Sequence, residues 1–205
     1  MIQLFWLRTD LRVADNTALS QALSNGPTVA VYLITPQQWL AHDDAPCKVD
    51  FWLRNLACLR EQLGKLNIPL LIRSCDDWQQ APATLLQLCR QIGAGAVHCN
   101  AEYGIHETRR DQACSSLLEP QGIAFTAHFD QLLLKPGSVL TQSGNYFQVF
   151  SQFRKVCYQR LHRSLPACLP YPTAQAALPV SSDELPAGVS EFAPPDAALR
   201  QLWPA

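Results

Sequence analysis

Short apolar runs alternate with longer amphipathic segments between residues 2 and 128. The apolar runs are rich in Val, Ile and Leu on both faces, as expected of parallel strands covered by helices on either side. They lie at Ile2–Leu7, Thr28–Ile34, Pro69–Ser74, Ala96–Asn100 and Ala124–His128. Helices are predicted between them at Asp15–Ser24, Lys48–Leu66, Gln79–Ile92 and Glu107–Glu119. This alternation predicts a Rossmann-like α/β fold, a doubly wound parallel sheet of about five strands with helices on both faces.

A different pattern begins after Phe129. An extended stretch leads into a Lys-Pro-Gly turn, and an amphipathic helix is predicted over Tyr146–His162. Beyond Ser164 the chain holds eight of its 15 prolines and no sustained periodicity, which is typical of a linker and not of a second core. We therefore predict an α/β domain over 1–164 and a Pro-rich interdomain linker over 165–205. A linker at this position implies a further domain after it in a longer protein.

Composition narrows the class of protein. A net charge of −1 gives no bulk electrostatic attraction to nucleic acid. The eight cysteines form no CxxC pair and no Cys/His spacing typical of zinc, so we interpret them as free thiols in a reducing compartment. Neither a signal sequence nor a long apolar segment is found. We expect a cytoplasmic monomer with no membrane contact and no metal site.

The loops that follow the strands are the candidate binding sites, because ligands of open parallel sheets bind at the carboxyl ends of the strands. These loops are Arg8–Asp15, Thr35–Pro46, Ser74–Trp78 and Asn100–Glu107. None contains the GxGxxG of a dinucleotide site, and the sequence has no GxxxxGKS/T phosphate loop. The sequence therefore does not support either kind of phosphate cradle.

The first loop is dense in charge and allows two interpretations. Two arginines, Arg8 and Arg12, flank Asp10, and charges at the end of a buried strand are costly unless they pair. In one interpretation the turn is a structural corner, in which Asp10 pairs with Arg8 or Arg12 and Asp15 caps the next helix. In the other interpretation the turn forms the floor of a binding site.

The second and fourth loops carry side chains suited to a heterocyclic ligand. Trp39 and His42 lie in the second loop, and Asn100, His106 and Glu107 lie in or beside the fourth. Taken singly, each aromatic or histidine side chain can be explained by ordinary packing. Glu107 can be explained by the preference for an acidic residue at the start of a helix. Because both loops meet at one edge of the sheet, together they predict a site for a flat heteroaromatic ligand with amide-type donors, which Glu107 can accept.

Several motifs resemble the DNA photolyase/cryptochrome family, and they occur in the family's order. The opening reads LFWLRTDLRVADNTAL, similar to the family's WFRxDLR and DNxAL, with Leu7 where Phe is usual. The resemblance continues in YLITPQQWLAH, NIPLL and NAEYGIHETRRD. Near its end, YFQVFSQF resembles the family's YxVFTPF, with Ser151 and Gln152 in place of Thr and Pro. These segments extend from residue 2 to about residue 165.

The resemblance implies a light-harvesting role for this chain. In the family, the N-terminal α/β domain carries an antenna chromophore, and a helical C-terminal domain holds FAD and damaged DNA. The antenna passes excitation energy to reduced flavin, which donates an electron that splits a cyclobutane pyrimidine dimer. The expected partners are therefore the helical FAD domain of the same chain and, in the full-length protein, damaged DNA. We expect no catalytic residue in this chain.

Among family members, the chain most resembles bacterial class I photolyases that bind methenyltetrahydrofolate. The resemblance implies that His42 and Glu107 contact the folate, with His106 where Asn is frequent. The candidate cofactor-binding residues are His42, His106, Glu107 and Asn100. Family members complete this site from the helical domain, so the chain alone is expected to bind folate weakly or not at all. A deazaflavin or flavin antenna is the alternative chromophore.

Three other functions are compatible with parts of the pattern. A cryptochrome-type photoreceptor would share this domain and lack repair. A nucleotide-binding module of the universal-stress or electron-transfer-flavoprotein kind would need a glycine-rich phosphate loop, which the sequence lacks. A domain without any ligand could serve as a scaffold for the helical half.

Overall fold

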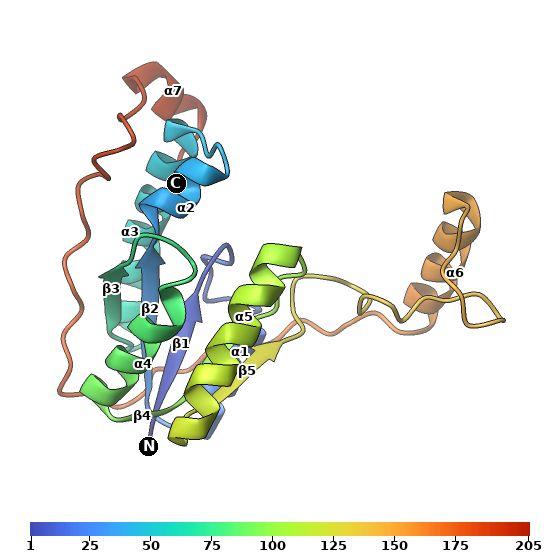
Figure 1. Cartoon of the computed structure of the whole chain (residues 1–205), viewed down its shortest axis with the longest axis horizontal. Coiled ribbons are helices and arrows are strands. Elements are labelled where there is room, and N and C mark those ends of the chain that lie inside the picture. Colours follow the sequence, from blue (N-terminus) through green and yellow to red (C-terminus); the bar gives the residue numbers. More distant parts are fainter.

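A five-stranded parallel sheet forms the centre of the computed structural model, which describes residues 1–205 (Figure 1). The strands are β1 (Ile2–Leu7), β2 (Thr28–Ile34), β3 (Leu70–Ser74), β4 (Ala94–Asn100) and β5 (Ala124–His128). Their order is β3-β2-β1-β4-β5, and β1 pairs with both β2 and β4. This order confirms the predicted doubly wound α/β fold and places the topological switch point between β1 and β4.

Helices cover both faces of the sheet because alternate residues of a strand point to opposite sides. The helices around the sheet are α1 (Thr17–Asn25), α2 (Pro36–Ala41), α3 (Pro46–Lys65), α4 (Ala81–Ile92), α5 (Ile105–Leu118) and the short 3-10 helix η1 (Glu119–Gln121). Phe5 and Leu7 pack in one apolar core with residues of α1 and α3. Leu4 and Trp6 pack in a second core with residues of α4 and α5. The buried β1 therefore separates two cores.

The observed limits of the elements differ from the predicted ones by a few residues, and α1 shows why. We predicted Asp15 as its cap, but Asp15 takes a left-handed conformation with φ of 48°. Asn16 caps the helix instead, and its Oδ1 accepts the Leu19 backbone N–H at 3.1 Å. The pattern did not predict α2, a single short helix that starts at Pro36 and buries only Trp39.

The Pro-rich segment 165–205 returns from α6 to the sheet, and its middle part runs along the outer edge of β3 (Figure 1). The Leu70 backbone N–H donates to Ser182 Oγ at 3.0 Å, and that of Ile72 donates to Asp183 Oδ2 at 2.8 Å. Further along, Phe192 is only 6% exposed and belongs to the core of α1 and α3. The segment therefore covers an edge strand that would otherwise present unpaired backbone groups. It ends in the short helix α7 (Ala197–Leu202).

Residues 131–164 form an arm that extends away from the sheet and ends in helix α6 (Phe150–Arg163) (Figure 1). This helix buries none of its residues. We call residues 131–164 the arm below. None of the helices in the chain is both long enough and apolar enough to cross a lipid bilayer.

Candidate functional site

A cavity of about 160 Å³ lies at the carboxyl ends of β1 and β2, beside the switch point. Loops and helices that follow the strands complete its walls, among them α2, α3 and the first turns of α5. Aromatic side chains form much of the lining: Trp6, Tyr32, Trp39, Trp52 and Trp78. Burial, with Glu102 and Asp44 nearby, raises the pKa of the Tyr32 hydroxyl, so this group is protonated at neutral pH.

The floor of the cavity is a buried cluster of four charged side chains. Arg8 Nη1 binds Asp111 Oδ1 at 2.6 Å, and Arg110 Nη2 binds Glu102 Oε2 at 2.8 Å. Arg110 also reaches Asp111 Oδ1 at 2.8 Å. Burial opposes the ionisation of Glu102, but Arg8 and Arg110 outweigh that effect and hold the pKa of Glu102 below its usual range. Glu102 is therefore ionised at neutral pH.

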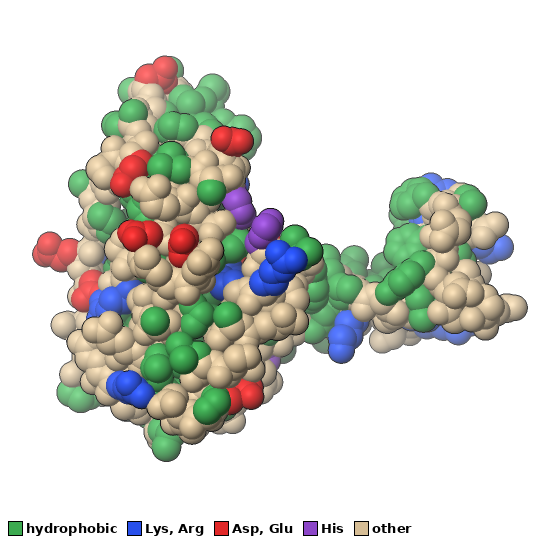
Figure 2. Space-filling model, viewed as in Figure 1, with side chains coloured by type: hydrophobic (Ala, Val, Ile, Leu, Met, Phe, Trp, Pro, Cys, Tyr) green, Lys and Arg blue, Asp and Glu red, His purple; other side chains and the backbone are tan.

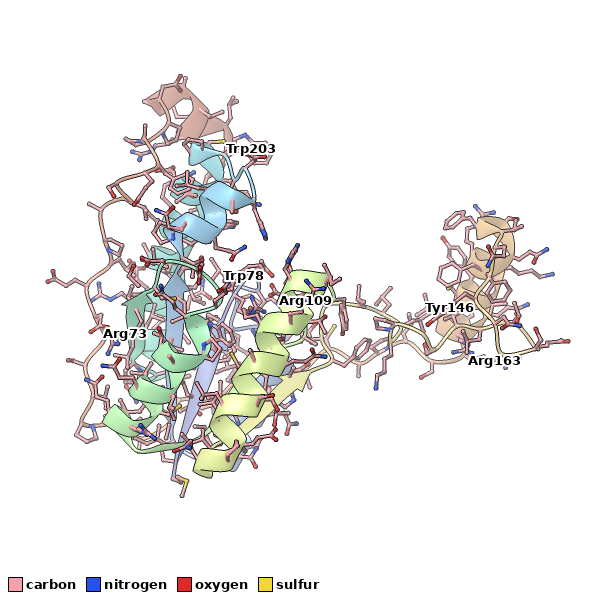
Figure 3. All side chains as sticks on the ribbon, viewed as in Figure 1. Arg73, Trp78, Arg109, Tyr146, Arg163 and Trp203 are labelled. Atoms are coloured by element: carbon pink, nitrogen blue, oxygen red, sulfur yellow. The ribbon has the colours of Figure 1, made fainter.

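The Arg110 guanidinium also orders the aromatic wall. Its central carbon lies 4.9 Å from the centre of the Trp6 ring and 4.7 Å from that of Trp78. Such cation–π contacts are favourable where the cation is withdrawn from water. Figure 3 shows Trp78 beside α5 and near Arg109, and both residues line a second pocket next to the cavity. The buried cluster therefore holds an indole at the side of the cavity mouth.

Two histidines lie at the rim, between α2 and α5, where Figure 2 shows histidine side chains at the surface. The rings of His42 and His106 are 5.7 Å apart, and His42 meets the Trp78 ring edge to face at 5.2 Å. The Trp78 backbone N–H donates to Gln38 Oε1 at 3.3 Å, so the amide nitrogen of Gln38 faces His42 Nε2 at 2.8 Å. This orientation of the Gln38 amide suits the tautomer of His42 in which Nε2 is the acceptor.

Glu107 completes the rim from the first turn of α5. Its side chain folds over Gly104, where an added Cβ would collide with the carboxylate. The Glu107 carboxylate takes part in no hydrogen bond or ion pair with the protein, whereas Glu102 binds Thr9 and Arg110. An acceptor of this kind, half-buried beside two histidines, is suited to donors of a ligand.

Of the predicted site residues, His42 and Glu107 line the cavity, and His106 contacts His42 at its rim. Asn100 lies apart from them, with 1% of its surface exposed. Its amide nitrogen donates to Asp10 Oδ2 at 2.6 Å and to Asn16 Oδ1 at 2.9 Å, and its oxygen accepts from the Ala18 N–H. These bonds use the whole side chain to hold the first loop against α1.

The first loop corrects one prediction. In the interpretation as a structural corner, Asp10 was to pair with Arg8 or Arg12, but its carboxylate accepts from Asn100, Asn16 and the Arg8 backbone N–H. The Arg12 guanidinium pairs with Asp130, just after β5. Both arginines find acidic partners that are more than a hundred residues away in sequence, so their charges are satisfied inside this chain. Arg8 also forms part of the cavity floor. The first loop is therefore both a structural corner and part of the candidate site.

Sequence reasoning did not select Gln38, Trp78 or Arg110 as site residues. Trp78 and Arg110 do lie in or next to loops that follow strands, which is the one signal that could have identified them. Their roles depend on contacts with each other and with Trp6, and these contacts join β1, the loop after β3 and α5.

Fold and site together define a doubly wound α/β domain with a cavity beside its switch point. Aromatic side chains line this cavity, and buried charged side chains form its floor. The model of the DNA photolyase family matches residues 3–172, and the chain belongs to this family. It is 42% identical over 155 residues to the deoxyribodipyrimidine photo-lyase of Vibrio cholerae, covering 75% of this chain and 33% of that protein.

Solved structures share the same fold. A bacterial class III photolyase from Agrobacterium tumefaciens superposes with a TM-score of 0.73 at 26% identity, covering 89% of this chain and 37% of that one. A cryptochrome from Synechocystis gives a TM-score of 0.79 at 24% identity, covering 95% of this chain and 41% of that one. The chain thus spans less than half the length of each of these proteins.

Proposed function

We propose that this chain forms the light-harvesting domain of a deoxyribodipyrimidine photo-lyase and that its rim site binds methenyltetrahydrofolate. Membership of the family and the similarity to the Vibrio enzyme support the first part. The observation that carries the second part is the unpartnered Glu107 carboxylate, which lies at the rim of the same cavity as His42. The FAD and the damaged DNA would be bound by the helical domain of the full-length protein.

The residues at the rim fit the donor pattern of a pterin ring. Glu107 can accept from the 2-amino group and the adjacent ring N–H, a bidentate pairing that selects this heterocycle. His42 can donate from Nδ1, since Gln38 occupies its other nitrogen. Trp78 and His106 flank His42 and offer aromatic surface beside it for a flat ring. When bound, the folate would absorb near-UV light and pass the excitation energy to reduced flavin.

A near-UV absorption spectrum of the full-length protein, purified with folate supplied, tests the proposal. We expect a band distinct from that of flavin. The substitution Glu107→Gln keeps the size of the side chain and replaces one acceptor by a donor. It should weaken folate binding by about 2 kcal/mol, or about 30-fold.

The matched control is Glu61→Gln, which removes one negative charge from an exposed position on α3, outside the cavity. This variant should retain the band. Absence of the band in the unaltered protein would contradict the folate assignment, and so would equal retention in both variants.

A further inference from the structure

Helix α5 begins without the side-chain cap that most helices have. Ser, Thr, Asp or Asn usually occupies the N-cap position, where its side chain accepts a backbone N–H of the first turn. Asn16 does this for α1, whereas Gly104 occupies the N-cap of α5 and has no side chain to offer. The backbone N–H groups of residues 105–107 have no acceptor within the chain. The positive end of the α5 dipole is therefore left uncapped.

The Glu107 carboxylate lies where the first atom of an N-cap side chain would be. A Cβ atom added to Gly104 would lie 2.0 Å from Glu107 Oε2, 2.7 Å from the carboxyl carbon and 3.1 Å from Oε1. These distances are shorter than the roughly 3.5 to 4.0 Å that separates non-bonded carbon atoms in favourable contact. The carboxylate can therefore take this position because residue 104 is glycine.

Electrostatics explains why the Glu107 side chain folds back toward the start of its own helix. Glu107 is the acidic residue of the first turn of α5, and negative charge is stabilised there by the helix dipole. The side chain is half-buried and lines the cavity. On the same turn, the His106 ring approaches His42 of α2 across the rim (Figure 1). The attraction thus keeps the carboxylate at the rim of the cavity.

The backbone at Gly104 does not itself require glycine. Its φ of −65° and ψ of 155° are extended values that other residues adopt without strain. Apart from the adjoining residues, the atoms nearest to an added Cβ all belong to the Glu107 carboxylate. A larger residue at position 104 would therefore displace this carboxylate, while the fold could accept it.

We propose that Gly104 is a positioning residue, which sets the place of the Glu107 carboxylate at the rim of the cavity. The inference rests on the proposed function only in taking the pterin ring of folate as the group that the carboxylate binds. A bidentate pairing depends on the position of both carboxylate oxygens, so a displaced carboxylate loses at least one of the two bonds. Gly104 acts through Glu107 and needs no contact with the ligand.

A double-mutant cycle in the full-length protein tests the proposal. Folate titrations, followed by the near-UV band, compare the unaltered protein with Gly104→Ala, Glu107→Ala and the variant that carries both. Gly104→Ala should weaken folate binding about fivefold to tenfold when Glu107 is present. In the Glu107→Ala background it should change binding by less than about twofold, because no carboxylate is left to displace.

The matched control is Gly64→Ala, which adds the same methyl group within α3, outside the cavity. No atom lies within 4 Å of a Cβ added there, so this variant should change folate binding by less than about twofold. Circular dichroism checks that all variants fold. Equal weakening by Gly104→Ala with and without the Glu107 side chain would overturn the proposal.

A second measurement requires no folate. Carbon-13 NMR of the 205-residue chain, labelled at the glutamate carboxyl groups, identifies the Glu107 signal by its loss in Glu107→Ala. This signal should shift in Gly104→Ala and stay unchanged in Gly64→Ala. An unchanged signal in Gly104→Ala would refute the positioning role. If the unaltered full-length protein bound no folate, the folate assignment would fail, and the carboxyl signal would still decide the role of Gly104.

Discussion

At the scale of single residues, the ion cluster under the cavity combines a structural and a functional role. The side chain of Arg8 is only 4% exposed, and it bonds Asp111 and approaches Glu102 at 3.5 Å. A buried charge of this kind is tolerated because its partners are also charged and close. Removing one member leaves the others buried without compensation, which costs far more than the loss of a surface ion pair.

The two arginines of the first loop should therefore differ in their effect on stability. Arg8→Met should lower the free energy of unfolding by about 3 to 5 kcal/mol, since Asp111 and Glu102 stay buried. Arg12→Met should lower it by a smaller amount, about 1 to 2 kcal/mol, because the Arg12 side chain is 40% exposed although that of Asp130 is only 3% exposed. Its partner Asp130 also keeps two hydrogen bonds from Thr17. Urea denaturation of both variants measures the difference, and equal losses would contradict a buried role for Arg8.

At the scale of elements, the segment 165–205 contributes more than its composition indicates. Asp183 bonds the edge of β3 through both its backbone N–H and its side chain. Phe192 packs edge to face on Trp39, with ring centres 6.0 Å apart, and Trp39 in turn lines the cavity. The segment thus supports one wall of the candidate site from behind.

Truncation of Phe192 tests this support. Phe192→Ala should lower the free energy of unfolding by about 3 to 5 kcal/mol, the usual cost of removing a buried phenyl group. It should also alter the tryptophan fluorescence of the folded protein, because Trp39 loses a packing partner. Trp203→Ala, at a residue 62% exposed, is the control and should change stability by less than about 0.5 kcal/mol. If Phe192→Ala were as mild as the control, the segment would be a detachable linker.

At the scale of the whole molecule, the chain holds a cavity at one edge of the sheet and an arm, residues 131–164, that extends away from it. It spans about a third of the length of the Vibrio enzyme, which it matches over 75% of its own length. Under the proposed function, absorption of light and electron transfer are divided between this chain and the helical domain. Energy captured at the rim is useful only when flavin lies nearby.

The 205-residue chain on its own should therefore show no light-driven splitting of cyclobutane pyrimidine dimers and no tight binding of FAD. Illumination of a dimer-containing oligonucleotide, followed by chromatographic analysis, measures the first, and a flavin fluorescence titration measures the second. The full-length protein under the same light is the positive control. Repair by the chain alone would place the flavin site within these residues and refute the division of roles.

Much of the architecture could be predicted from the sequence because it depends on short-range patterns. Apolar runs such as Thr28–Ile34, buried along its whole length, indicate a central parallel strand without reference to any partner. The placement of His42 and Glu107 at one sheet edge follows from the same alternation, since parallel strands end together. Hydrophobic periodicity and the shared edge of the parallel strands therefore determined the fold and the position of the candidate site, whereas the family was indicated by the sequence motifs.

Only the tertiary structure decided which charges pair and which side chains enclose the cavity. The bond of Arg8 to Asp111 spans 103 positions, and that of Ile72 to Asp183 spans 111. No local pattern encodes such pairings, because each depends on how two distant segments pack once the sheet is formed. The hydrogen bond from Asn100 to Asp10 in the first loop and the packing of Phe192 on Trp39 likewise join residues that are distant in sequence. The free energy of burying charged and aromatic groups selects these partners, and it acts only in the folded chain.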